Sequence, residues 1–158
     1  MDQKEYDERM AAAKARSDAA NAKRAERAEQ RAAAARVADQ ERQTSLDEAL
    51  VDAESKVGEL GKKIAIVHAT YADGSIAGSA IVKVASGPQW AAYKAQIGNA
   101  KGTEIDATTE RLWRPNVVYP ELAVVDRLCG ELPFFSTALG DAVGRLCGVR
   151  IEDIAAKP

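Results

Sequence analysis

Large apolar residues are distributed unevenly along the chain. Residues 2–42 consist mainly of alanine interspersed with charged and amide side chains, and neither glycine nor proline interrupts the run. These residue types favour helix, so the pattern predicts a helix of about 60 Å over residues 2–42. Its only large apolar residues are Tyr6, Met10 and Val37. Because alanine buries little surface, we expect an arm that either frays or docks on a partner through these three residues, not a self-standing leucine-zipper coiled coil.

A second helix with a better apolar face is predicted over residues 45–58. Ser45 followed by Glu48 three residues later is a capping-box pattern, and glycines 58 and 61 close the segment. Apolar residues then recur at helical spacing, which indicates a face that packs on the following domain or on a second copy. These positions are Leu46, Leu50, Ala53, Val57 and Leu60.

Period-two alternation begins at about residue 63. The stretch "KKIAIVHATYADGSIAGSAIVKVAS" contains two runs rich in β-branched residues around Asp73 and Gly74. Because glycine accepts the positive φ that a tight turn requires, this pattern predicts a β-hairpin. The residues before it form a helical arm, residues 1–60. The hairpin opens a compact domain, residues 63–158.

Short helices separated by prolines follow the hairpin. The sequence predicts helices over residues 86–97, 104–114, 121–132 and 133–148, with a bent connector between Pro115 and Pro120. The fold class is therefore α+β: a long N-terminal helical arm and a small domain in which a β-hairpin packs with several short helices. We assign the aromatic residues to the domain core or to apolar contacts. They are Trp90, Tyr93, Trp113, Tyr119, Phe134 and Phe135.

Charge and composition narrow the function classes. The chain has 158 residues and a formal net charge of -2, so no overall field draws it to nucleic acid or to an anionic membrane. No apolar run reaches the roughly 20 residues of a membrane span, and the polar start differs from a signal peptide. The arm carries a local excess of basic residues over 14–36, but acidic residues interrupt it. Contact with nucleic acid is therefore disfavoured, although it stays open as an alternative.

Candidate chemistry is sparse. His68 is the only histidine, and Cys129 and Cys147 fit neither a zinc spacing nor a disulfide framework. No nucleophile, base and oxyanion-binding group can be nominated together. We therefore expect no enzyme activity, no metal and no cofactor, and we expect both cysteines to be buried, reduced thiols.

The region from residue 63 to 150 resembles the small tail-assembly chaperones of long-tailed bacteriophages. The segments that carry the resemblance are "GPQWAAYKA", "LWRPNVVYPE", "VVDRLCGELP" and "ALGDAVGRLCGV". The resemblance implies a non-enzymatic assembly protein whose partners are other phage structural proteins of the tail, baseplate or head. It also implies that the protein works in the host cytoplasm during assembly.

The long arm departs from that family, whose members typically lack one. An ordered arm suits a protein that is retained in the virion and bound along other subunits. Two alternatives remain: an oligomeric adaptor that binds copies of itself through the N-terminal helices, and a nucleic-acid-binding protein that uses the basic stretch 14–36.

Overall fold

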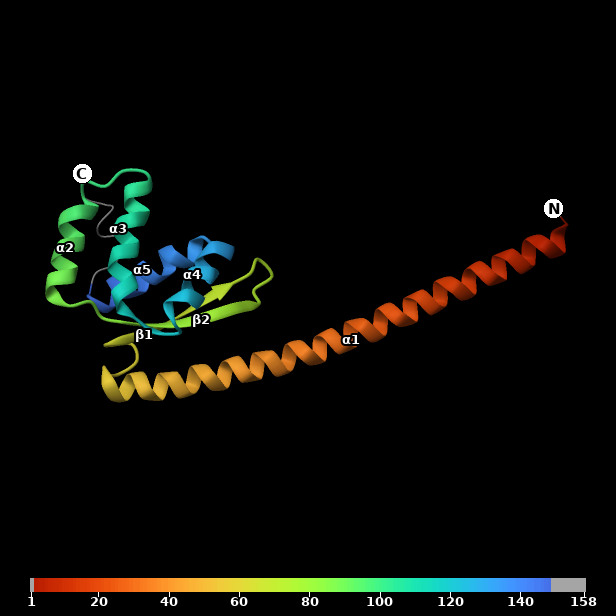
Figure 1. Cartoon of the computed structure of the whole chain (residues 1–158), viewed down its shortest axis with the longest axis horizontal. Helices are drawn as coiled ribbons and strands as arrows, with labels where there is room; N and C mark the ends of the chain where they lie inside the picture. The colour runs from red at the N-terminus through yellow and green to blue at the C-terminus, as the bar shows by residue number, and fades with distance from the viewer. Residues whose placement is uncertain (1, 149–158) are drawn as a thin grey trace. The chain divides into compact units, whose positions relative to one another are not determined.

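The computed structural model describes residues 2–148 and has an α+β fold (Figure 1). One long helix is followed by a small antiparallel sheet and four shorter helices, with a 3-10 turn at Arg114–Asn116. No helix among the described residues has the length and hydrophobicity needed to cross a bilayer. The elements are α1 (Gln3–Lys56), β1 (Ile64–Thr70), β2 (Ile76–Lys83), α2 (Gly87–Ile97), α3 (Thr103–Trp113), β3 (Val117–Tyr119), α4 (Leu122–Glu131) and α5 (Phe134–Leu146).

Helix α1 is continuous, so the predicted break between residues 42 and 45 is wrong. Ser45 lies inside the helix, where the capping-box pattern has no free N-terminal N–H groups to satisfy. The chain nevertheless divides into two compact units between Thr44 and Ser45. The last part of α1, residues 45–56, therefore belongs to the C-terminal unit, and the predicted domain boundary near residue 60 lies too late.

The hairpin prediction is confirmed. Strands β1 and β2 pair in antiparallel register from Ile64 opposite Lys83. At the turn, the Tyr71 N–H donates to the Ser75 carbonyl at 2.9 Å, and Gly74 has a φ of +83°. The structure adds a strand that we did not predict: β3 pairs with the other edge of β2 and gives the sheet order β1-β2-β3.

The two faces of this sheet contribute to two apolar clusters, because successive side chains of a strand point to opposite faces. On one face, Ile64 and Ile81 are buried against Leu46 and Ala53 of α1. Residues of the other face, including Val82, join a larger cluster with α2–α5. The end of α1 is thus a structural layer of the C-terminal unit.

Local features of the sequence position the short helices. Ser86 accepts a hydrogen bond from the Gln89 N–H at 3.3 Å, and the Gln89 side chain accepts one from the Ser86 N–H at 2.9 Å, which completes a capping box before α2. Helices α3 and α5 approach closely at Gly140, where an added Cβ would collide with the Thr109 methyl group. A cis peptide bond joins Tyr119 to Pro120 ahead of α4.

Candidate functional site

The predicted contact residues of the arm lie on an exposed helix. Tyr6, Met10 and Val37 have exposed fractions of 47%, 55% and 57%. The residues from 2 to 41 are all exposed, so this stretch of α1 presents its full circumference to solvent. A helix that is polar around most of its surface and buries no face draws little stability from tertiary packing.

The predicted contact residues of the second helical segment are mostly used within the chain. Leu46 is buried, and Leu50 and Val57 are half-buried against the sheet. Leu60 lies beyond the helix, forms an isolated bridge with Ile64, and stays 41% exposed. Leu46 is therefore a core residue of the C-terminal unit and not a free contact residue, because the sheet already covers its face of α1.

The aromatic residues separate into buried and accessible groups. Trp113 is fully buried and donates its Nε1–H to the Ser136 hydroxyl at 3.0 Å. Trp90 and Tyr93 stack with ring centroids 5.2 Å apart, and burial raises the pKa of Tyr93. Tyr119 is half-buried against the sheet.

The prediction that Phe134 belongs to the buried side of the last helix is wrong. Phe135, Leu139 and Val143 are buried at spacing i, i+4 and i+8, and this face of α5 packs in the larger cluster. Phe134 is rotated about 100° from that face and is 87% exposed. It is an accessible apolar residue, as one of its two predicted roles requires, and it is not part of the core.

Phe134 borders a surface hollow beside strand β1. A pocket of about 210 Å³ is lined by the end of β1 and the start of α5, and a second pocket of about 370 Å³ continues along the same two elements. His68 and Ala138 line both pockets. The His68 Nδ1 lies 2.7 Å from the Ser79 hydroxyl, so His68 makes a cross-strand contact in the sheet.

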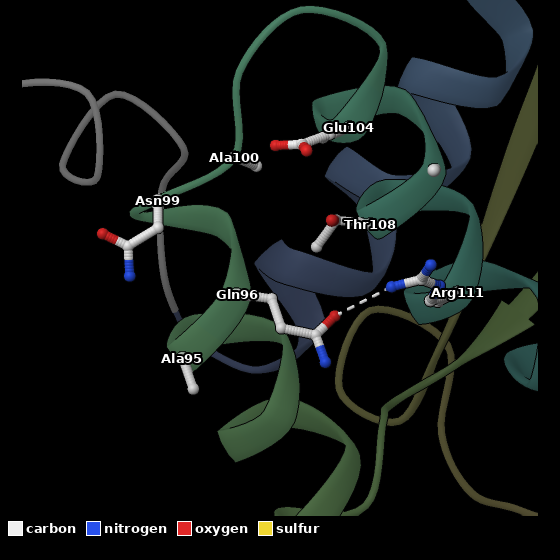
Figure 2. Close-up of a pocket in the computed structure, with 8 residues that line it drawn as sticks. Ala95, Gln96, Asn99, Ala100, Glu104, Thr108 and Arg111 are labelled. Atoms are coloured by element: carbon white, nitrogen blue, oxygen red, sulfur yellow. Dashed lines mark hydrogen bonds between the residues drawn. The ribbon is translucent and has the colours of Figure 1, made fainter.

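A more polar pocket lies between α2 and α3 (Figure 2). Its volume is about 380 Å³, and its polar side chains come from the end of α2, from the turn after it and from one face of α3. The Arg111 guanidinium donates to Gln96 Oε1 at 3.3 Å, which links the two helices across the pocket. We did not predict this site from the sequence. Its lining residues are Ala95, Gln96, Asn99, Ala100, Glu104, Ala107, Thr108 and Arg111.

The main ion pair of the C-terminal unit lies outside these pockets. The Arg114 guanidinium donates two hydrogen bonds to Asp126, at 2.7 and 2.8 Å, and a third to Glu110 at 2.8 Å. The hydrogen bonds from Arg114 hold the pKa of Asp126 below its ordinary value. Because the pair is solvent-exposed, its contribution to stability is at most about 1 kcal/mol.

The described residues contain no group of three or more His, Cys, Asp or Glu side chains that could hold a metal ion. Both cysteines are free thiols and half-buried. Burial, followed by the negative charges of Asp126 and Glu110, raises the pKa of Cys129 to about 11. This microenvironment is the opposite of one that activates a nucleophilic cysteine.

We expect Cys129 to react slowly with alkylating reagents. At pH 8 its thiolate fraction is about 100-fold below that of a thiol with the ordinary value, because the pKa is higher by about two units. The rate of iodoacetamide labelling, followed by mass spectrometry in a Cys147→Ser variant, measures this. Labelling of Cys129 as fast as that of a free thiol peptide would contradict the structure.

Comparison of the chain with protein-family models, with curated proteins and with solved structures finds no significant match.

Proposed function

We propose that the chain is a non-enzymatic bacteriophage structural or assembly protein that acts through contacts with other proteins of the tail, baseplate or head. The observation that best supports this proposal is the helix of residues 3–44, whose residues up to 41 are all exposed. The tail-assembly-chaperone-like pattern of residues 63–150 supports the phage context.

The exposed helix favours a partner on energetic grounds. Its described ion pairs, such as Arg9 with Glu5, join residues about one helical turn apart and are solvent-exposed. Each contributes at most about 0.5 kcal/mol to the stability of the helix. Alanine-rich sequence favours helix, but isolated helices in water gain little beyond this propensity. Binding along another protein would bury one side of the arm and stabilise it, which is the behaviour expected of a retained particle component.

The structure weakens the adaptor alternative, because part of the surface that it needs for dimerisation is buried within the chain. It relied on dimerisation through residues 45–60, yet Leu46 and Ala53 on the apolar face of that segment are buried against the chain's own sheet. A dimer through the same face would have to displace this packing. The arm of residues 3–44 remains the stronger candidate for contact with a partner.

We expect serine substitutions at Tyr6, Met10 and Val37 together to weaken partner binding at least 10-fold, because these are the arm's large apolar side chains. The tagged chain is used to capture partners from an assembly extract of the phage that encodes it. The captured protein is identified by mass spectrometry, and its affinity is then measured with purified components.

The matched control replaces three exposed polar residues of the same helix with serine, and it should bind like the unaltered chain. These residues are Asn21, Gln30 and Gln40. Amide hydrogen exchange of the isolated chain separates the alternatives. Fast exchange over residues 3–44 in a monomer agrees with the proposal, whereas a protected arm in an oligomer favours the adaptor. Steeply salt-dependent DNA binding would instead favour the nucleic-acid alternative.

A further inference from the structure

The outer edge of β1 carries backbone groups that no other strand uses. β1 stands first in the sheet order, so among the described residues it has no neighbouring strand on its outer side. Across the inner side, the Val84 N–H donates to the Lys63 carbonyl at 2.8 Å. Because successive residues of a strand direct their backbone groups to opposite sides, the even-numbered residues of β1 point outward. The Gly61 N–H bonds the Ile64 carbonyl at 2.9 Å on this outer side. The remaining outward residues are Ile66, His68 and Thr70.

The sequence of β1 contains none of the residues that usually protect an open strand edge. Such edges commonly carry charged side chains, prolines or bulges. β1 reads IAIVHAT, without proline, lysine, arginine or a carboxylate, and its only register shift lies at the end, between Ala69 and Thr70. At the opposite edge of the sheet, β3 has three residues and is followed by Pro120. The edge of β1 is therefore the one that is suited to pairing with a further strand.

Helix α5 borders this edge and runs in the opposite direction to β1. The pocket at the end of β1 contains Phe134, from the first turn of α5, and the pocket nearer the start of β1 contains Leu146, from the last turn. His68 and Ala138 line both pockets. Phe134, Ala138, Ala142 and Leu146 follow one another every four residues, so they share the side of α5 that faces the pockets.

Two copies of β1 fit edge to edge about a two-fold axis at Val67. Antiparallel order about this axis places Ile66 opposite His68 of the second copy, and His68 opposite Ile66 of the second copy. Both residues direct their N–H and C=O groups into the seam, so each opposite pair exchanges two backbone hydrogen bonds. An edge that pairs with itself in this way is self-complementary, as a two-fold interface requires.

The same axis brings the two α5 helices together. The pocket linings place Ala138 and Ala142 beside the middle of β1, so the level of Val67 falls between the two alanines. The axis therefore sets Ala138 opposite Ala142 of the second copy, where small side chains permit close approach. Phe134, which is 87% exposed, then lies opposite Leu146 of the second copy. The register of the strands and the register of the helices thus have one common centre.

We propose that a second copy of this chain pairs with the outer edge of β1, so that the two sheets become one. β1 is about 23 Å long, and the sheet and α5 are two layers of about 10 Å each, so the seam buries on the order of 1,000 Å² in total. This area is at the low end for specific interfaces, and we expect a dissociation constant on the order of 10 μM. The inference goes beyond the proposed role of the arm, because β1 and α5 belong to the C-terminal unit.

Sedimentation equilibrium of the full chain between about 1 and 500 μM, with amide exchange followed by NMR, tests the proposal. We expect a monomer at the lowest concentration and a dimer at the highest. The Ile66 and His68 amides should exchange about 10-fold more slowly in the dimer, because only there are they bonded. Exchange over residues 3–44 should not change with concentration, so this result leaves the proposed function of the arm to its own test.

A pair of charge variants tests the helix register. Ala138→Glu and Ala142→Lys should each weaken the dimer at least about 10-fold, because each puts a long charged side chain where the helices approach closely. In an equal mixture, the introduced carboxylate faces the introduced ammonium group, so the mixture should dimerise at least about 5-fold more tightly than either variant alone. Thr137→Glu is the matched control: it is exposed on α5 but outside both pockets, and it should dimerise like the unaltered chain.

Three results would overturn the proposal: a monomer at every concentration, a dimer whose Ile66 and His68 amides exchange as fast as in the monomer, or a mixture no tighter than its components. An oligomer with a protected arm and an open β1 edge would assign self-association to the N-terminal helix instead. Phe134→Ala changes an exposed side chain and should weaken the dimer about 5-fold, so it tests the helix contact even if an alanine variant fails to fold.

Discussion

Replacing Trp113 with alanine is expected to lower the free energy of unfolding by about 3–5 kcal/mol. Its indole is 1% exposed and belongs to the larger cluster, which joins α3 to α5 and to the sheet. The substitution removes this packing and leaves the Ser136 hydroxyl without its donor. Because small domains have total stabilities of about 5–15 kcal/mol, the loss should be visible as a large drop in the urea midpoint.

The fluorescence of Trp90 reports unfolding of this variant, since it is half-buried and stacks on Tyr93. Phe134→Ala is the matched control: it also truncates an aromatic residue, but one that is 87% exposed, and it should change stability by no more than about 0.5 kcal/mol. A loss below about 1 kcal/mol for Trp113→Ala, or equal effects of the two substitutions, would show that Trp113 is not central to the core.

The parts of the fold that the sequence predicts best depend on local chemistry. Gly74 accepts a positive φ, so the hairpin turn could be placed without knowledge of any distant residue. The capping box at Ser86 and the prolines likewise fix helix starts through contacts a few residues apart. These signals are readable because each one involves neighbours in sequence.

The errors arise where distant contacts decide the outcome. Strand β3 has three residues, and its pairing with β2 brings together segments more than 30 positions apart in sequence. Phe134 and Phe135 each have an apolar residue four positions later, so periodicity alone supports either face of α5. The face with Phe135 is the buried one because it packs in the larger cluster with residues of α3, α4 and the sheet, which are distant from it in sequence.

The candidate pocket could not be predicted because its signal is shared by two helices. Glu104, Thr108 and Arg111 at helical spacing look like an ordinary polar face of α3. They form a pocket only because Gln96 of α2 and Asn99 of the turn after α2 lie opposite them. The sequence alone was enough to predict Tyr6 and Met10 as contact residues, since isolated large apolar residues stand out in an alanine-rich and charged helix.

A chain that begins at residue 45 is expected to unfold at the same urea midpoint as the full chain, whereas one that begins at residue 61 should lose cooperative unfolding. The unit boundary falls between Thr44 and Ser45, and the residues up to 41 are exposed. In the chain that begins at residue 45, Ser45 becomes a helix start, where its capping-box pattern with Glu48 can satisfy newly freed N–H groups.

Removal of residues 45–60 has the opposite consequence, because it uncovers one face of the sheet. Ile64 and Ile81, both fully buried, lose their cover of Leu46 and Ala53. At about 1.5–3 kcal/mol for each large apolar side chain exposed, the loss is comparable to the stability of a small domain. Far-UV circular dichroism with urea measures both truncations. Equal midpoints would mean that the end of α1 is not a layer of the domain.

Single substitutions in the full chain separate the loss of packing from the effects of truncation. Leu46→Ala should cost about 2–4 kcal/mol because the side chain is 3% exposed between α1 and the sheet. Val51→Ala, on the same part of α1 but 69% exposed, should change stability by at most about 0.5 kcal/mol. If the two variants behave alike, the cluster around Leu46 does not stabilise the domain. If they differ as expected, residues 45–56 are a structural part of the C-terminal unit, and the arm for which we propose partner binding ends at about residue 44.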